Sequence, residues 1–411
     1  MRWGICGLLF AAVVLSYVDR QVLSVLKPSL QHAYGWTETG YGDVVFWFLA
    51  AYGIGYVIFG RLVDRIGAKA GYTVAVTLWT LGQMGQALVT GTRGLALVRL
   101  PLALGESGAF PSALKAVAEW FPKKERALAI GLFNAGANIG AVLTPLIVAA
   151  IVPRLGWRAA FIVTGSFTVI WLAAWLIFYR TPSRHPRLSQ TEREHIEADP
   201  VEAKRPVAWR TLLTRREAWA YILGRFLIDP VWWLFLSWLP DFFSKRFGVD
   251  MVHFGPPLAA IYVMADVGSI VGGWASGRLM SRGAGLNWGR KGAMLGCALA
   301  VLPVAFAGGV PQMWMAVLIL GLACAGHQGF SANLYALPSD LFPPWAAGSV
   351  VGVGGLAGAL GGMVMAKYAG FVLQHVGAFG PIFLVASLAY LTALAVIHLL
   401  TPRYKPATLP G

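Results

Sequence analysis

Several ionisable side chains lie inside long apolar segments, where a charge is costly and usually serves a function. The segment SYVDRQVL contains Asp19 and Arg20, and RLPLALGESGAFPS contains Arg99 and Glu106. The spacing of Arg99 and Glu106 is about two helical turns, so both point the same way, with Glu106 roughly 10 Å further along the axis. A guanidinium that holds a carboxylate can exchange it for another anion, which leaves the carboxylate able to take a proton.

The axial positions of these residues suggest how they can pair. Counted from the ends of their apolar segments, Asp19 and Arg99 fall at similar heights, while Glu106 falls nearer the middle. We therefore expect that Asp19 can pair with Arg99 and that Glu106 is the more desolvated acid, and hence the better proton carrier. The alternative is a set of static ion pairs that only fixes helix packing.

Other polar residues in the apolar segments can either bind ligand hydroxyls or hydrogen-bond between helices. Asn134 and Asn138 have the i, i+4 spacing of one helix face. Asp229 precedes a helix-breaking proline and tryptophans that could stack on a sugar or anchor the helix at the membrane interface, and it can also pair with Arg225 at i, i+4. The polar candidates are Tyr17, Tyr52, Asn134, Asn138, Asp229, Trp232, His327, Gln328, Ser331 and Asn333.

These residues belong to a chain whose composition indicates an all-α membrane protein. Of its 411 residues 57% are hydrophobic and only 12% are charged, with a mean hydropathy of +0.64. A span needs about 20 apolar residues, and the sequence predicts twelve transmembrane helices. Their ranges are 3–26, 39–60, 70–90, 94–119, 127–152, 158–180, 217–244, 255–279, 290–308, 311–338, 346–373 and 378–400.

The longest polar segment, 181–216, divides the chain into two six-helix halves, 1–180 and 217–411. The halves resemble each other: GRLVDRIG at 60–67 is echoed by GRLMSRGA at 277–284, and WFPKKERALAIGLFNAG by LFPPWAAGSVVGVGGLAG. A parallel repeat of this kind occurs in secondary transporters, where the substrate site lies near the membrane midplane between the halves. The segment 181–216 is expected to be a hydrophilic linker with one short surface helix.

The distribution of charge predicts the orientation. With both termini in the cytoplasm, 22 Lys and Arg residues lie on the inner side and six on the outer side. The net charge of +15 therefore reflects membrane topology, and no nucleic-acid partner is expected. Cys6, Cys297 and Cys324 lie in apolar segments without metal-ligand spacing, and no hydrolase or metalloenzyme motif falls in a span. We expect no metal, no cofactor and no enzymatic activity.

The sequence also resembles a known family over nearly its whole length. GRLVDRIGAK is similar to the signature loop of major facilitator transporters. The segments SYVDR, RLPLALGESGAFPS and WFPKKERALAIGLFNAGANIGAVLTP resemble the anion:cation symporter branch. FLIDPVWWLFLSWLP, ADVGSIVGGW and AGHQGFSANLYALPSDLFP resemble the bacterial hexuronate transporters.

This resemblance implies proton-coupled symport of a sugar acid, such as galacturonate or glucuronate, by alternating access of a monomer in the inner membrane. Asp19 and Glu106 match the branch's proton-linked acids, and its anion site is matched by Tyr17, Arg20, Tyr52 and Arg99. Asp64 and Arg65 would belong to a cytoplasmic gate, which is not expected to be symmetric because Ser281 occupies the place of Asp64 in the second half. The alternatives are a transporter of an aldonate, aldarate or monocarboxylate, and a sensor with this fold that does not transport.

Overall fold

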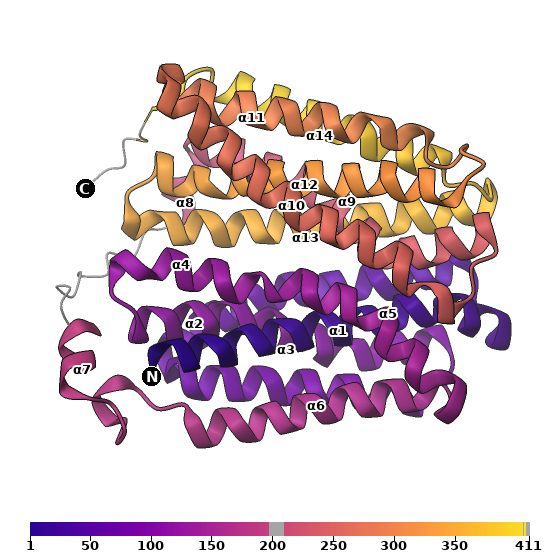
Figure 1. The fold of residues 1–411 in the computed structure, drawn as a ribbon, viewed down its shortest axis with the longest axis horizontal. Coiled ribbons are helices and arrows are strands. Elements are labelled where there is room, and N and C mark those ends of the chain that lie inside the picture. The colour runs from indigo at the N-terminus through magenta and orange to yellow at the C-terminus, as the bar shows by residue number, and fades with distance from the viewer. Residues whose placement is uncertain (197–208, 406, 408–411) are drawn as a thin grey trace. The chain divides into compact units, whose positions relative to one another are not determined.

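The fold comes from a computed structural model, which describes residues 1–196, 209–405 and 407. The described residues form α-helices and short turns, without a β-strand. They divide into two compact units: unit 1 is Met1–Trp36 with Trp47–Ala203, and unit 2 is Thr37–Phe46 with Lys204–Gly411. Each unit is a bundle of long helices (Figure 1). The middle of the predicted linker, 197–208, lies outside the described residues.

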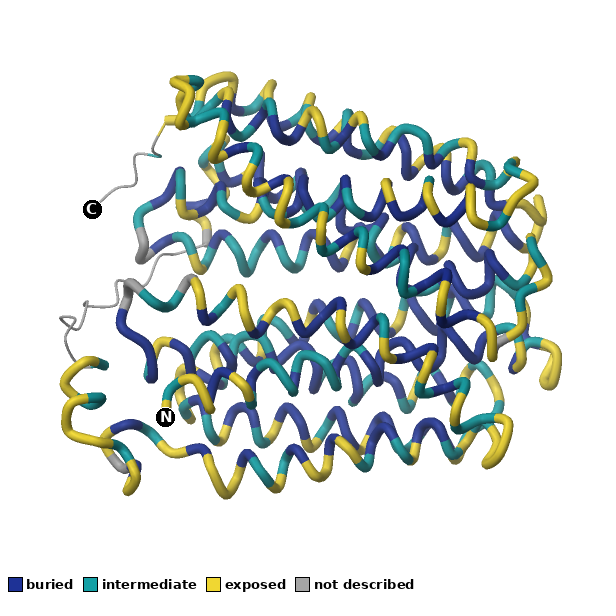
Figure 2. The backbone as a smooth tube through the Cα atoms, in the orientation of Figure 1, coloured by how far each residue is buried: buried dark blue, intermediate teal, exposed yellow. Residues whose placement is uncertain are grey.

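Nine helical stretches within the described ranges are long and apolar enough to cross a membrane. Large apolar side chains remain exposed on them, for example Ile170 at 66% and Ile177 at 65% on α6 (Trp157–Phe178). Figure 2 shows exposed and buried positions alternating along such helices. Since lipid is as apolar as these side chains, one face of each helix can stay uncovered by protein. The predicted all-helical membrane fold is confirmed.

Unit 1 is built around α1 (Arg2–Tyr34), which packs against the helices that follow it in this unit. These are α3 (Thr92–Trp120), α4 (Lys123–Asn134), α5 (Gly136–Leu155) and α6. The α1 helix extends eight residues beyond its predicted end, through Pro28, and stops at Gly35, which is left-handed with φ 62°. As a result Lys27, which follows directly after the predicted span 3–26, is completely buried within α1.

The predicted loops near residues 61–69 and 280–289 are largely helical. A single helical stretch, α2 (Glu38–Gly85), covers two predicted spans and is interrupted at Gly67, whose φ of 81° suits glycine. In unit 2, α10 (Gly255–Leu279) continues through a π-helical turn (Met280–Ala284) into α11 (Gly285–Val301). Hydropathy locates spans but does not distinguish a helical kink from a loop, because both carry polar residues.

Unit 2 contains α9 (Arg216–Phe247), which packs against α12, α13 and α14. The other long helices are α10, α11, α12 (Met313–Leu341), α13 (Pro344–His375) and α14 (Gly380–Leu400). The first residues of α2 also belong here, since the Tyr41 hydroxyl donates to the Ser237 carbonyl at 2.9 Å and Asp43 pairs with Lys367. Two short helices, α7 (Gln190–Ile196) and α8 (Trp209–Leu213), lie within the predicted linker range.

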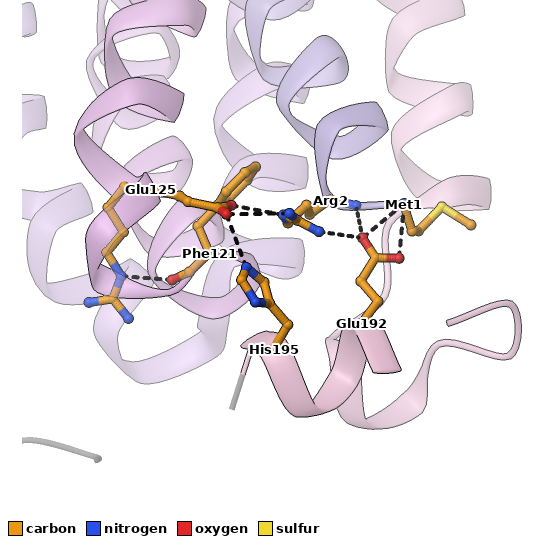
Figure 3. Close-up of polar contacts among 7 residues, drawn as sticks. Met1, Arg2, Phe121, Glu125, Glu192 and His195 are labelled. Carbon is orange, nitrogen blue, oxygen red and sulfur yellow. Dashed lines mark hydrogen bonds and ion pairs between the residues drawn. The ribbon is translucent and has the colours of Figure 1, made fainter. Parts of the chain in front are cut away.

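Charged residues tie α7 to the start of α1 (Figure 3). Arg2 Nε donates to Glu125 at 2.9 Å, and its backbone N–H and guanidinium donate to Glu192 at 3.0 and 3.3 Å. The His195 ring contacts the second oxygen of Glu125 at 3.0 Å. Glu125 on α4 thus joins α1 to α7, and the Arg2 guanidinium, assisted by His195, holds the pKa of this carboxyl below its usual range.

We predict that Glu125→Gln loosens α7 without disturbing the helical bundle. The amide keeps the size of the carboxylate but loses the charge that attracts Arg2 and His195, so backbone amides of 190–196 should exchange hydrogen faster. In the wild type the docked form is the ionised form. Docking should therefore be complete above the ordinary glutamate pKa of about 4.3 and weaken as pH falls through the lower pKa of docked Glu125.

Hydrogen exchange measured by mass spectrometry, corrected for the intrinsic rate at each pH, tests this prediction. Glu194→Gln is the matched control, because among the described residues the Glu194 carboxylate accepts only from Gln190 within α7, at 3.1 Å. Unchanged exchange in Glu125→Gln would show that other contacts hold α7.

Helices α9 and α13 approach closely at Gly358, which faces Asp229. A Cβ at Gly358 would lie 2.0 Å from Asp229 Oδ2 and 2.9 Å from its Cγ, so the carboxylate would have to move. Gly355, one turn away on the same helix, has nothing within 4 Å of the corresponding position. Alanine substitutions at Gly358 and Gly355 therefore separate the effect of losing a glycine from the effect of a steric clash with Asp229.

We predict that Gly358→Ala destabilises the protein by about 1–3 kcal/mol, the usual cost of overpacking. Gly355→Ala should be neutral or slightly stabilising, because alanine is the better helix former. Thermal unfolding of both variants in the same detergent measures the difference. Equal unfolding temperatures would mean that α9 and α13 separate at no cost.

Candidate functional site

The centre of the candidate site in unit 1 is a buried ion pair between α1 and α3. Arg20 Nε and Nη2 both donate to Glu106 Oε2, at 2.8 and 2.6 Å. The side chains are 8% and 0% exposed. The guanidinium also lies 4.8 Å from the Tyr17 ring and 5.1 Å from the Tyr52 ring. These aromatic faces can stabilise the cation, and the predicted anion-site residues Tyr17, Arg20 and Tyr52 are thus close together.

The expected pairing of Asp19 with Arg99 is wrong. Asp19 Oδ2 instead accepts hydrogen bonds from Trp79 Nε1 at 2.7 Å and from the Thr168 hydroxyl at 2.9 Å. It forms no ion pair within the described residues. Successive residues on a helix point about 100° apart, so Arg20 faces α3 while Asp19 faces α2 and α6. Burial does not separate the two acids, since the Glu106 side chain and Asp19 are both 0% exposed.

Arg99 contacts the same aromatic ring, Phe48, as Arg20 does. Its guanidinium is 4.7 Å from the Phe48 ring, and that of Arg20 is 5.8 Å from the same ring. Arg99 Nη1 donates to Gln86 Oε1 at 3.1 Å. One aromatic ring therefore contacts both arginines proposed for the anion site.

Several buried polar residues near these charges were missed by the sequence analysis. Gln86 donates to Gln83, and Gln83 donates to Thr164. Sequence reasoning considered charged groups first, and these side chains are neutral. A useful signal was present, because Gln83 and Gln86 have i, i+3 spacing within a predicted span.

The two asparagines differ in environment. Asn138 on α5 is buried at 6% exposure, whereas Asn134 is exposed as the last residue of α4. Ala135, between α4 and α5, keeps helical backbone angles with φ −59° and ψ −21°. Of the two, Asn138 is the better placed to contact residues inside unit 1.

Unit 2 contains a second buried arginine and carboxylate, both on α9. Arg225 Nε and Nη2 lie 2.6 Å from Asp229 Oδ2, which confirms their i, i+4 pairing. The hydroxyl of Tyr335 donates to Asp229 Oδ1 at 3.1 Å, and Arg225 donates to the Tyr221 hydroxyl at 3.1 Å. Both oxygens of Asp229 are therefore engaged. Tyr335 was missed as a candidate.

The α12 candidates separate into two groups. His327 stacks on Trp232 with ring centroids 5.1 Å apart, and its ring nitrogens contact the hydroxyls of Tyr390 at 2.6 Å and Ser331 at 3.2 Å. Asn333 instead donates to the backbone carbonyls of α10 and α12, at 3.0 and 2.9 Å. The contacts of Asn333 link helices. Trp232, His327 and Ser331 form a single polar and aromatic cluster. Gln328, the residue after His327, is half-buried.

The proposed gate residues lie at the interruption of α2. Asp64 and Arg65 are exposed, two or three residues before Gly67. Within the described parts of the chain, no group of three or more His, Cys, Asp or Glu side chains is arranged to hold a metal ion.

Comparisons with known proteins bear on this arrangement. A family model described as the Major Facilitator Superfamily matches residues 9–366. A hexuronate transporter of Escherichia coli (strain K12) is 31% identical, covering 99% of this chain and 95% of the relative. A galacturonate transporter of Dickeya chrysanthemi is 34% identical, covering 67% and 81%.

Solved structures show the same fold at low sequence identity. A bacterial homolog of the human lysosomal transporter Spinster, in an inward-facing and occupied conformation, has a TM-score of 0.78 at 18% identity, covering 99% of both chains. A D-xylose-proton symporter has a TM-score of 0.76 at 16% identity, also covering 99% of both chains. The resemblance predicted from the sequence is confirmed by the match over most of the chain: this protein belongs to the Major Facilitator Superfamily.

Proposed function

We propose that this protein is a proton-coupled symporter that imports a sugar acid by alternating access. The observation that carries the proposal is the buried Arg20–Glu106 ion pair among aromatic rings. Relatives named hexuronate, galacturonate and D-galactonate transporters support a sugar acid as the substrate. The preferred substrate is a hexuronate such as galacturonate or glucuronate.

Arg20 is the proposed ligand of the substrate carboxylate. It already places two donors on one carboxylate oxygen, that of Glu106. A substrate carboxylate could take both donors in a fork-like arrangement, and Glu106 would then be left without its counter-ion in a desolvated site. Protonation removes that cost. Binding of the anion and of a proton would thus favour each other.

The other candidates have supporting roles in this proposal. Arg99 provides a second positive charge, while Tyr17 and Tyr52 flank the first. Asp19 is the second proton-linked acid. Hydroxyl and ring contacts with the sugar are assigned to Asn138, Trp232, His327, Gln328 and Ser331, and Asp229 contributes by positioning Arg225 and Tyr335.

We further propose twelve spans in two six-helix halves, 1–180 and 217–411, joined by a cytoplasmic linker, 181–216. The stretches α2 and α10 to α11 each hold two spans, and α3 adds one to the nine apolar stretches. Gly67 and Gly283 interrupt the two double stretches with φ of 81° and 89°, within the repeated GRL segments, which supports a parallel repeat.

The excess of Lys and Arg on one side supports cytoplasmic termini in an inner membrane. Asp64 and Arg65 then lie on the cytoplasmic side and are proposed as gate residues. The protein is proposed to act as a monomer.

Aldonates are a second candidate substrate class. A D-galactonate transporter of Escherichia coli O6:H1 is 30% identical over 96% of this chain. The two classes share a carboxylate and differ in whether the sugar is a ring, so competition between galacturonate and galactonate in one uptake assay ranks them. A sensor that only binds would show no uptake of either.

Purified protein in liposomes should accumulate labelled galacturonate when an inward proton gradient is imposed, and should not accumulate galactose, which lacks the carboxylate. Arg20→Lys should reduce galacturonate affinity by about tenfold to a hundredfold, because lysine keeps the charge but not the planar two-donor group. Arg93→Lys, on the first turn of α3, is the control. Accumulation of galactose, or full affinity in Arg20→Lys, would contradict carboxylate recognition by Arg20.

Neutral substitutions of Glu106 and Asp19 are both expected to abolish accumulation driven by protons. Glu106→Gln imitates the protonated acid and releases Arg20, so galacturonate should still bind and exchange across the membrane, but without accumulation driven by protons. Asp19→Asn keeps an oxygen that can accept from Trp79 and Thr168, so it should also bind and exchange while losing accumulation.

Binding affinity separates the two variants. Glu106→Gln should bind more tightly than the wild type at high pH, since no carboxylate competes for Arg20, whereas Asp19→Asn should not. Counterflow and gradient-driven uptake in the same vesicles measure exchange and accumulation. Accumulation with wild-type pH dependence in Glu106→Gln would remove Glu106 from the coupling mechanism.

A further inference from the structure

The side chain of Gln21 is buried on α1 without a hydrogen-bond partner. It is 1% exposed, and neither its Nε2 nor its Oε1 has a partner among the described residues. A buried amide that makes no hydrogen bond costs free energy, and native proteins contain few such groups. That cost is removed when a polar group of a ligand bonds to the amide, so Gln21 is a candidate ligand contact.

Gln21 lies on the same face of α1 as the proposed anion site. Residues four apart on a helix differ by about 40° in direction and lie about one turn apart. Gln21 therefore follows Tyr17 one turn further along α1. The Tyr17 ring in turn lies 4.8 Å from the Arg20 guanidinium. The amide thus continues the polar face that Tyr17 and Arg20 begin.

Three consecutive residues of α1 point in three different directions. Asp19 accepts from side chains on α2 and α6, and Arg20 donates to a side chain on α3. Each step along a helix turns the side chain by about 100°. Gln21 therefore points nearly opposite to Asp19, and its direction is next to that of Arg20. The amide is on the side of the anion site and away from the contacts of Asp19.

Helix α5 packs against α1 on the side of this amide. A Cβ at Gly136 would lie 2.7 Å from the Phe10 carbonyl, and one at Gly140 would lie 2.7 Å from Tyr17 Cβ, so the two helices run in the same direction. Four residues beyond Gly140, Thr144 lies at the level of the amide. Its hydroxyl donates to the Gly140 carbonyl at 2.7 Å. Because a hydroxyl has a single proton, this one does not donate to the amide.

We propose that Gln21 hydrogen-bonds to a hydroxyl of the sugar acid whose carboxylate is held by Arg20, and thereby selects hydroxylated carboxylates over unsubstituted ones. A carboxamide offers two donors and an acceptor oxygen, and a hydroxyl both donates and accepts, so the two groups satisfy each other. A ligand without hydroxyls leaves the amide buried and unbonded, and a site of this kind rejects such a ligand. This inference rests on the proposed function and adds a substrate contact to it.

The Gln21 amide then has opposite effects on stability and on binding. Methionine has nearly the shape of glutamine but no amide. Gln21→Met removes an unbonded polar group, so the unfolding temperature of the ligand-free protein should stay the same or rise.

Gln83→Met is the matched control for stability. The Gln83 amide is also buried, at 0% exposure, but it accepts from Gln86 at 2.6 Å and donates to Thr164 at 2.8 Å. Its loss leaves two buried partners unbonded, so the unfolding temperature should fall by a few degrees.

Binding of labelled galacturonate to the full-length detergent-solubilised protein, and its competition by cyclohexanecarboxylate, give both affinities at one pH. Cyclohexanecarboxylate has a six-membered ring and a carboxylate but no hydroxyl. Gln21→Met should weaken galacturonate binding about tenfold, as expected for the loss of one or two hydrogen bonds, and leave cyclohexanecarboxylate binding unchanged. Arg20→Lys should instead weaken both ligands by a similar factor, because both carry the carboxylate.

Unchanged galacturonate affinity in Gln21→Met, or an equal loss for both ligands, would overturn the inference. So would a fall in unfolding temperature as large as that of Gln83→Met, or failure to fold, because the amide would then have a structural role. Failure of the wild type to bind galacturonate, glucuronate or galactonate would instead overturn the proposed function, and the inference with it.

Discussion

The cost of burying charge in a helical bundle surrounded by lipid governs the site. A buried arginine or carboxylate must be paired or hydrogen-bonded, since breaking a buried pair costs several kcal/mol. Arg20 pairs with one oxygen of Glu106 across two helices, while one oxygen of Asp19 accepts from the indole of Trp79 and a threonine hydroxyl. The second oxygen of each carboxyl is buried without a hydrogen-bond partner among the described residues. The two acids therefore have different partners: Glu106 pairs with an arginine, and Asp19 accepts from neutral donors.

The two units pair an arginine with a carboxylate in different ways. In unit 1 the arginine and the carboxylate come from different helices, α1 and α3, so any movement of one helix changes the pair. In unit 2 Arg225 and Asp229 are one turn apart on α9 and move together, and Tyr335 occupies the remaining carboxylate oxygen. A pair within one helix is a poor sensor of helix movement and exchanges partners less readily. This difference favours unit 1 as the place where anion binding and proton binding are linked.

The sequence located the buried charged residues better than it predicted their partners. Residue counting gives the height of a side chain along a helix, and by height Asp19 and Arg99 could meet. Their directions around the helix depend on which neighbours pack there, and tertiary contacts decide that. The same limit explains Lys27, which lies just beyond the predicted span 3–26 although α1 continues past Pro28 and buries it. Hydropathy located the spans but could not show that α2 continues as helix to Gly67 and beyond it.

The sequence analysis missed several buried neutral side chains, whereas it named the buried charged residues of the candidate site in unit 1. A single amide or hydroxyl in an apolar segment costs little free energy once it has a hydrogen-bond partner. The sequence therefore gives little reason to single out Gln83, Gln86 and Thr164. The structure shows that these three side chains are hydrogen-bonded in a row. Gln86, in the short turn after α2, bonds to Gln83 on α2, which bonds to Thr164 on α6. A direct contact of Arg99 with Asp19 would hold the acid as an ion pair and make proton uptake costly at neutral pH. Asp19 instead accepts from the neutral donors Trp79 and Thr168, so its protonation breaks no ion pair.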